Sequence, residues 1–138
     1  MFDKINATFQ FHQEALSLRH ERQKVLANNI ANADTPGFKA RDMDFSKALS
    51  TAVSRHRTDQ QGAALTRTSA HHLTGNQSST DIGASLKYRV PTQPSMDGNT
   101  VDMDTERTQF ADNSVRYQAS LVMINSYIKG LKTAMQSE

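Results

Sequence analysis

The fold is decided by the end of the chain, residues 102–137, which read DMDTERTQFADNSVRYQASLVMINSYIKGLKTAMQS. This stretch contains no proline and a single glycine, Gly130. A set of positions alternates at spacings of four and three residues over more than four heptads. Such a pattern is typical of a helix in a coiled coil. The positions are Met103, Arg107, Phe110, Ser114, Tyr117, Leu121, Ile124, Ile128, Leu131 and Met135.

The charges at the two ends of this stretch favour the same helix. Asp102 suits the N-cap, while Asp104 and Glu106 place negative charge in the first turn, where the helix dipole favours it. Lys129 and Lys132 lie near the other end, where cations are favoured. The acidic residues also resemble a site for a hard cation, but they lack the EF-hand loop pattern. Capping is the better interpretation, and we expect no metal here.

A second long helix is expected near the start of the chain, because residues 2–33 contain neither glycine nor proline. Its apolar positions form two stripes that lie too far apart around the helix for one partner to cover both. Two long helices side by side also have little surrounding mass. We therefore expect other chains to supply the missing burial. The stripes are Ile5, Phe9, His12, Leu16, Gln23, Leu26 and Ile30, and Phe11, Ala15, Leu18, Arg22 and Val25.

The middle of the chain has a different composition. Residues 54–99 hold four of the six glycines and two of the three prolines, whereas residues 42–53 have modest helical character. Residues 88–94 are compatible with a short strand or an extended arm. The prediction is a single, mainly α domain over residues 1–138, whose terminal helices pack as an antiparallel, coiled-coil-like pair. Its parts are an N-terminal helix in 2–35, a turn and loop-rich middle in 36–99 that includes a short β element, and a C-terminal helix in 100–138.

The first helix is expected to end in residues 27–38, which read ANNIANADTPGF. Pro36 disfavours helical geometry at the residue before it, and Pro36-Gly37 suits the central positions of a type II turn. The small alanines permit close approach of another backbone. The asparagines can bond neighbouring backbone and set the register of packed helices.

This stretch resembles the N-terminal signature of the axial proteins of the bacterial flagellum, the rod and hook family. Long helices at both chain ends around a loose middle match the layout of that family. Within it, three further stretches resemble those of proximal rod proteins: ARDMDF at 40–45, DGNTVDMDTER at 97–107 and QFADNS at 109–114.

The resemblance implies a structural subunit rather than an enzyme. It implies export through the flagellar type III apparatus and assembly into the proximal rod, a hollow axial drive shaft at the inner membrane and periplasm. The implied partners are further copies of the chain, other rod proteins, the ring–rod junction protein, the inner-membrane ring and the export gate. The N-terminus lacks a basic region followed by an apolar run, so we expect no Sec signal.

The expected assembly interface combines both helices. It consists of Ile5, Phe9, Leu16, Leu18, Val25, Leu26, Asn29, Ile30, Asn32, Phe110, Tyr117, Leu121, Ile124, Ile128 and Leu131. The expected motif turn consists of Asp34, Thr35, Pro36, Gly37 and Phe38.

Other function classes find little support in the sequence. The chain of 138 residues has no cysteine and a formal charge of +2, without a charge block suited to nucleic acid. Its five histidines do not show the spacing of zinc ligands. We expect no catalytic residue, no cofactor and no small-molecule substrate. The alternatives left open are a needle or adaptor subunit of a related type III secretion system and, with less support, a wall hydrolase, which would need paired carboxylates in a pocket.

Overall fold

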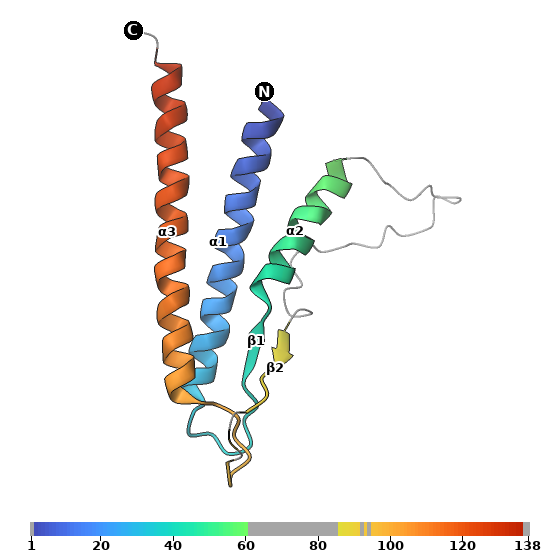
Figure 1. Ribbon diagram of the computed structural model, residues 1–138, viewed down its shortest axis with the longest axis vertical. Helices are drawn as coiled ribbons and strands as arrows, with labels where there is room; N and C mark the ends of the chain where they lie inside the picture. Colours follow the sequence, from blue (N-terminus) through green and yellow to red (C-terminus); the bar gives the residue numbers. More distant parts are fainter. Residues whose placement is uncertain (1, 61–85, 92, 94, 137–138) are drawn as a thin grey trace, which may run out of the picture.

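The described residues of the computed structural model form three helices and two short strands (Figure 1). It describes residues 2–60, 86–91, 93 and 95–136, with the side chains of residues 5–54 in the first of these ranges. The elements in chain order are α1 (Phe2–Ala31), β1 (Arg41–Met43), α2 (Phe45–Gln60), β2 (Leu86–Tyr88) and α3 (Met103–Met135).

The terminal helices α1 and α3 pack against each other in opposite directions, as the sequence predicted (Figure 1). Asp102 is the N-cap of α3, and its side chain accepts hydrogen bonds from the backbone N–H groups of Asp104 and Thr105. Asp104 and Glu106 lie in the first turn. The predicted capping of α3 is therefore confirmed.

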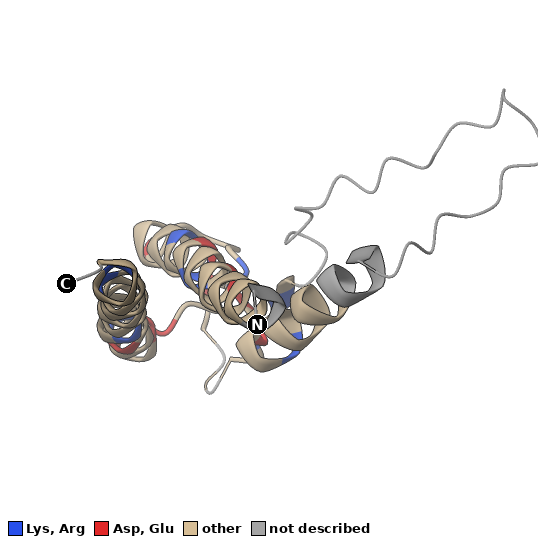
Figure 2. Ribbon diagram, turned by 90° about the horizontal axis from the view of Figure 1, so that it is seen from above, with Lys and Arg blue, Asp and Glu red and all other residues tan. Residues whose placement is uncertain are grey.

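Helix α1 lies between α3 and α2 (Figures 1 and 2). Ala15 and Leu18, from the second apolar stripe of α1, are buried. The guanidinium of Arg19 lies over the ring of Phe45, the first residue of α2, at 4.2 Å from the ring centre. The chain itself therefore covers part of the second stripe, and the expectation that other chains must supply that burial was wrong to this extent.

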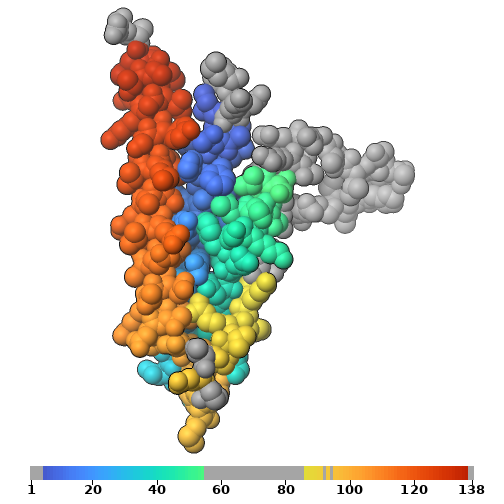
Figure 3. All heavy atoms as spheres, viewed as in Figure 1, coloured from blue at the N-terminus to red at the C-terminus, as the bar shows by residue number. Residues whose placement is uncertain are grey.

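The second stripe is partly covered because residues 42–53, which the sequence marked as only modestly helical, contribute to helix α2. Asp44 caps it, since its Oδ1 accepts a hydrogen bond from the Lys47 N–H at 3.1 Å. Helix α2 then continues to Gln60, well past the predicted end at residue 53. Figure 3 shows it covering the flank of α1 that faces away from α3.

Strands β1 and β2 form a two-stranded antiparallel sheet, in which Asp42 lies opposite Lys87. The backbone N–H of Arg89 extends the pairing by donating to the Ala40 carbonyl at 2.9 Å. The predicted short β element is confirmed, although it starts at Leu86 and ends at Tyr88, earlier than residues 88–94 suggested.

The buried core of the described residues is small and unusually polar. Its apolar members are Ala15, Leu18, Leu26, Ala40 and Met43, and its polar members are Asn29, Asn99, Glu106 and Asn113. Most of these residues lie in the half of the molecule nearest the turn between α1 and β1. We call this half the closed end.

Replacing Leu26 with alanine tests the apolar part of this core. Leu26 is fully buried, so we expect Leu26→Ala to lower the free energy of unfolding by about 2–5 kcal/mol in urea titrations. Val122→Ala is the matched control, because Val122 is 64% exposed and its truncation is expected to change stability by less than about 0.5 kcal/mol. Equal effects of the two substitutions would contradict the placement of the core.

Candidate functional site

The motif turn at the end of α1 has the predicted geometry. Gly37 adopts a positive φ of 73°, and the Phe38 N–H donates to the Thr35 carbonyl at 3.2 Å. Both features belong to a type II turn with proline and glycine at its centre. The turn from Asp34 to Gly37 is exposed, whereas Phe38 is half-buried.

Asn99 holds this turn against the segment that leads into α3. Its Nδ2 donates to the carbonyl of Asn32 at 3.0 Å, of Ala33 at 2.6 Å and of Thr35 at 3.0 Å. Its Oδ1 accepts from the Val101 N–H at 2.8 Å. A single buried amide therefore binds three carbonyls of the segment that follows α1. The sequence analysis missed Asn99, which stands out only as part of the stretch that resembles proximal rod proteins.

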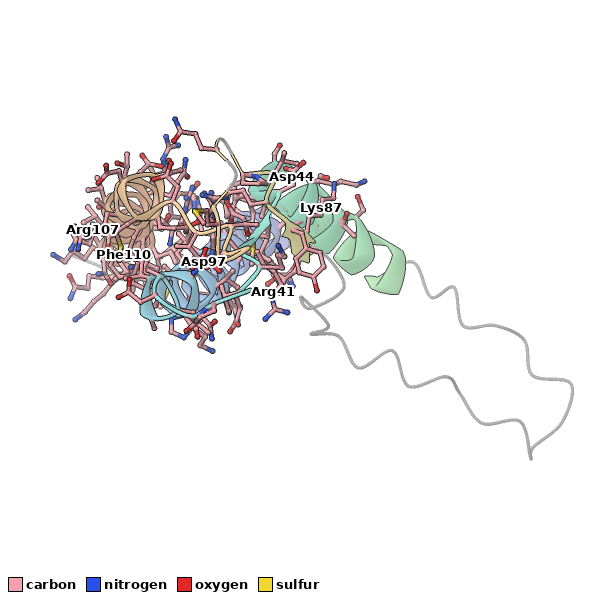
Figure 4. All side chains as sticks on the ribbon, turned by 90° about the horizontal axis from the view of Figure 1, so that it is seen from below. Arg41, Asp44, Lys87, Asp97, Arg107 and Phe110 are labelled. Carbon is pink, nitrogen blue, oxygen red and sulfur yellow. The ribbon has the colours of Figure 1, made fainter. Side chains whose placement is uncertain are left out.

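The connection from α1 to β1 and the connection from β2 to α3 are also hydrogen-bonded to each other. The Gly37 N–H donates to the Asp97 carbonyl at 2.9 Å, and the Thr100 N–H donates to the Phe38 carbonyl at 3.0 Å. Gly98 has the same positive φ of 73° as Gly37. Seen from below, Asp97 lies between α3, which carries Arg107, and the strand that carries Lys87 (Figure 4).

Exchanging the Asn99 amide for a carboxylate tests this clamp. In Asn99→Asp, oxygen replaces the Nδ2 donor and faces three carbonyl oxygens. We expect a loss of about 2–4 kcal/mol in the free energy of unfolding at neutral pH, measured by urea titration. The matched control is Asn125→Asp on the exposed face of α3, which should be nearly neutral. Unchanged stability of Asn99→Asp would show that the clamp is dispensable.

Two further buried asparagines tie the helices together. Asn29 Nδ2 donates to the Arg41 carbonyl at 2.7 Å and to Glu106 Oε2 at 3.2 Å. Asn113 Nδ2 donates to the Arg19 carbonyl at 2.9 Å. The predicted bonding of asparagine to neighbouring backbone is confirmed for Asn29 and also for Asn32, whose Nδ2 donates to the Asn28 carbonyl at 2.8 Å.

A charged cluster, Arg22, Asp42, Arg89 and Glu106, joins α1, the sheet and α3. Arg22 donates from Nε and Nη2 to the two carboxylate oxygens of Asp42, at 2.9 and 2.8 Å. Arg89 Nη2 lies 2.6 Å from Asp42 Oδ2, and its Nη1 lies 2.9 Å from Glu106 Oε1. The sequence offers no signal for this cluster, because its members come from four distant segments.

The two carboxyl groups of the cluster have opposite pKa shifts. Burial opposes the ionisation of Asp42, but the hydrogen bonds and charge of Arg22, together with the Met43 N–H and Arg89, lower its pKa below the usual value. For Glu106, burial dominates and raises the pKa, although the Asn29 hydrogen bond and the Arg89 charge work in the other direction.

The shift of Asp42 predicts a pH-dependent contribution to stability. Since its pKa is lowered on folding, the contribution is present above the ordinary Asp pKa of about 3.9 and is lost as the pH falls through the folded value. We expect Asp42→Asn to cost about 2–4 kcal/mol of unfolding free energy at neutral pH. The difference from wild type should shrink below about pH 4.

Asp112→Asn is the control for this measurement, because Asp112 pairs with Arg116 on the exposed surface of α3. Its expected cost is below about 1 kcal/mol. A deficit of Asp42→Asn that stayed constant from neutral to acidic pH would contradict the role given to its charge.

The residues expected at an assembly interface fall into three groups. Leu18, Leu26 and Asn29 are buried within the chain, so in this conformation they belong to its core and present no surface to another subunit. Phe9, Leu121 and Ile128 are exposed. The half-buried group is Ile5, Leu16, Val25, Ile30, Asn32, Phe110, Tyr117, Ile124 and Leu131.

The expected interface also omitted several exposed apolar residues of α3. Val115, Val122, Met123, Tyr127 and Met135 are all at least 45% exposed. Val115 and Val122 lie on a partial second stripe that the sequence shows beside the first, together with Ala111 and Gln118, but the expected interface did not include that stripe.

The described part of the chain shows neither a metal-binding cluster nor a spanning helix. Its His, Asp and Glu side chains do not gather in a group of three that could hold a metal ion. Among the described helices, none combines the length and apolarity needed to cross a membrane.

Comparison with known proteins gives consistent matches. The family model described as flagella basal body rod protein matches residues 9–39, which span much of α1 and the motif turn. The flagellar basal body rod protein FlgB of Escherichia coli strain K12 is 55% identical over 99% of this chain and 99% of its own length. The protein of the same name from Salmonella typhimurium is 53% identical over 99% of this chain and 98% of its own length. The protein of the same name from Aeromonas hydrophila is 49% identical over 99% of this chain and 96% of its own length.

The helical fold and these relatives define a structural protein of the flagellar basal body rod, which serves motility and is not an enzyme. Within that class, the chain belongs to the FlgB family. The resemblance to flagellar axial proteins that residues 27–38 indicated is confirmed.

Proposed function

We propose that this subunit assembles through its terminal helices into the hollow proximal part of the rod, after export through the flagellar type III apparatus. Its neighbours would be further copies of the chain, other rod proteins, the ring–rod junction protein and the inner-membrane ring, next to the export gate. The support is the family membership together with the apolar surface that the two helices leave uncovered.

This uncovered surface is concentrated on α3. Leu121 and Ile128 belong to the predicted heptad stripe of α3. The residues of α3 that are buried against α1 at the closed end, Glu106 and Asn113, each lie one position before a member of that stripe. Val115 and Val122 lie on a different side of the same helix, because they are offset from Leu121 by more than a quarter turn. Apolar residues at helical spacing on two sides of one helix suit contacts with two neighbouring helices.

The apolar surface reaches α1 as well. Phe9 and Phe11 are exposed in the N-terminal half of α1, and the His12 ring lies 5.9 Å from that of Tyr127 across the helix pair. The two helices stand further apart toward the chain termini than at the closed end (Figure 1). The apolar residues between them are therefore only partly covered by the chain itself. A helix from a neighbouring subunit would complete this packing, and this incomplete packing is the observation that carries the proposal.

A charge placed in the stripe tests assembly separately from folding. Ile128 is 46% exposed, so Ile128→Asp should leave the unfolding free energy of the monomer within about 1 kcal/mol of wild type. In an assembled rod the aspartate would be desolvated without a partner, at a cost of several kcal/mol. We expect a folded, soluble monomer and the loss of swarming in a strain that carries only this variant.

Asn125→Asp is the control, because it adds the same charge to the same helix at an exposed polar position. It should leave swarming intact. Recovery of normal basal bodies and normal swarming with Ile128→Asp would count against the stripe as an assembly surface.

A further inference from the structure

A glycine with positive φ lies in each of the two connections between the sheet and the helix pair. These glycines are Gly37 on one side and Gly98 on the other. A Cβ atom added to Gly98 would lie 3.9 Å from Gly37 Cα, so the two glycines are neighbours. Beyond them, Arg89 and Asp42 of the sheet segment reach the helices through the charged cluster. The cluster therefore lies where a rotation about the glycines would open the structure.

Glu106 is the poorly compensated member of this cluster. Its side chain is fully buried, and it accepts a hydrogen bond from Asn29 Nδ2. Although Glu106 Oε1 and Arg89 Nη1 lie 2.9 Å apart, neither atom has a hydrogen-bond partner among the described residues, because their alignment is unfavourable. Arg89 instead directs Nη2 to Asp42, at 2.6 Å. An ionised carboxylate in such a place is costly unless water reaches it.

We propose that the Arg22–Asp42–Arg89–Glu106 cluster is a proton-operated clasp between the β1–β2 sheet and the helix pair, closed when Glu106 holds a proton and loosened when Glu106 is ionised. The direction follows from the surroundings of the carboxyl group. In the closed arrangement the neutral acid avoids the cost of a buried charge. In an opened arrangement the carboxylate is hydrated, and ionisation is no longer opposed.

The other groups that face Glu106 would not loosen the clasp as the pH rises. They are Arg22 and Asn29 from α1, Asp42 from β1, Arg89 beside β2 and Asp102 at the start of α3. Arginine and asparagine do not titrate in the physiological range, and the pKa values of Asp42 and Asp102 are lowered, the latter by the side-chain and backbone hydrogen bonds of Thr105. The clasp is thus weakened at low pH by protonation of Asp42 and at higher pH by ionisation of Glu106.

Distance measurements between two spin labels test the clasp directly. The chain has no cysteine, so Lys87→Cys and Arg107→Cys, both at exposed positions, provide specific labelling sites on the sheet and on α3 (Figure 4). As the pH rises from about 4 to about 8, we expect a second, longer distance to gain population. The ratio of open to closed forms should rise by up to about tenfold per pH unit, the limit for one linked proton.

Glu106→Gln, made in the doubly labelled protein, keeps the shape of the side chain without the charge. It should hold the short distance across the whole pH range. Glu21→Gln on α1 is the matched control, because it removes a carboxylate outside the cluster, and its distances should follow wild type. Glu106→Leu provides a second non-ionisable variant should Glu106→Gln fail to fold.

A second label pair at exposed positions Ser17 and Asn125 reports on the helix pair and should not change with pH. The proposal is overturned if the wild-type distance from residue 87 to residue 107 is the same at both ends of the pH range. It is equally overturned if the pH-dependent change persists in Glu106→Gln or Glu106→Leu. None of these outcomes depends on whether the chain assembles into a rod, so this proposal and the proposed function can fail independently.

Discussion

The buried polar contacts of the closed end are the constraint on which the rest of the structure depends. Apolar stripes attract each other without direction, and two heptad helices held only by such stripes can slide by a turn with modest loss. Asn99, Asn29 and Asn113 remove that freedom, since each donates to backbone carbonyls of another segment. A shift of one turn would leave these amides and carbonyls buried without partners, at about 1–3 kcal/mol for each group. The antiparallel pair therefore has one register.

The sequence was sufficient for features that depend on local order along the chain. The helix in residues 102–137, the Asp102 cap and the Pro36-Gly37 turn are each encoded in local sequence, and each was predicted correctly. The heptad positions did not identify the buried residues of α3, since Glu106 and Asn113 lie beside that stripe. Features that join distant segments were not predictable in the same way. Asn99 and the Arg22–Asp42 pair form contacts across 64 and 20 residues, and no local pattern marks the partners. The error about burial had a similar origin. The apolar residues of α2, Phe45, Ala48, Leu49, Ala52 and Val53, share one face at helical spacing, but this local pattern does not show that the helix packs against α1.

The distribution of side chains in this subunit differs from that of a self-sufficient globular protein. Glu106, Asn29 and Asn113 are buried, whereas Val115 and Val122 are exposed. Replacing a buried ionic or polar group by an apolar one often increases stability, so a chain selected for the stability of its monomer alone would be expected to have the reverse arrangement. Polar contacts in the interior define one register of the helix pair, while their gain in stability is limited. Apolar residues on the outside of α3 are then left for contacts beyond the chain, which agrees with membership in a family of rod subunits.

The two halves of the molecule thereby take on different physical tasks. At the closed end, hydrogen bonds and ion pairs depend steeply on geometry, so they determine the directions in which α1 and α3 leave the turn. Toward the termini, the helices depend on apolar contacts that tolerate small changes of angle. The exposed stripes are thereby held at a defined angle, while the contacts between the outer parts of the helices tolerate small adjustments. The angle between the helices is then determined by polar groups that lie far from the exposed apolar residues of α3, so substitutions of Asn99 or Asp42 are expected to change the direction of the helices without altering those residues.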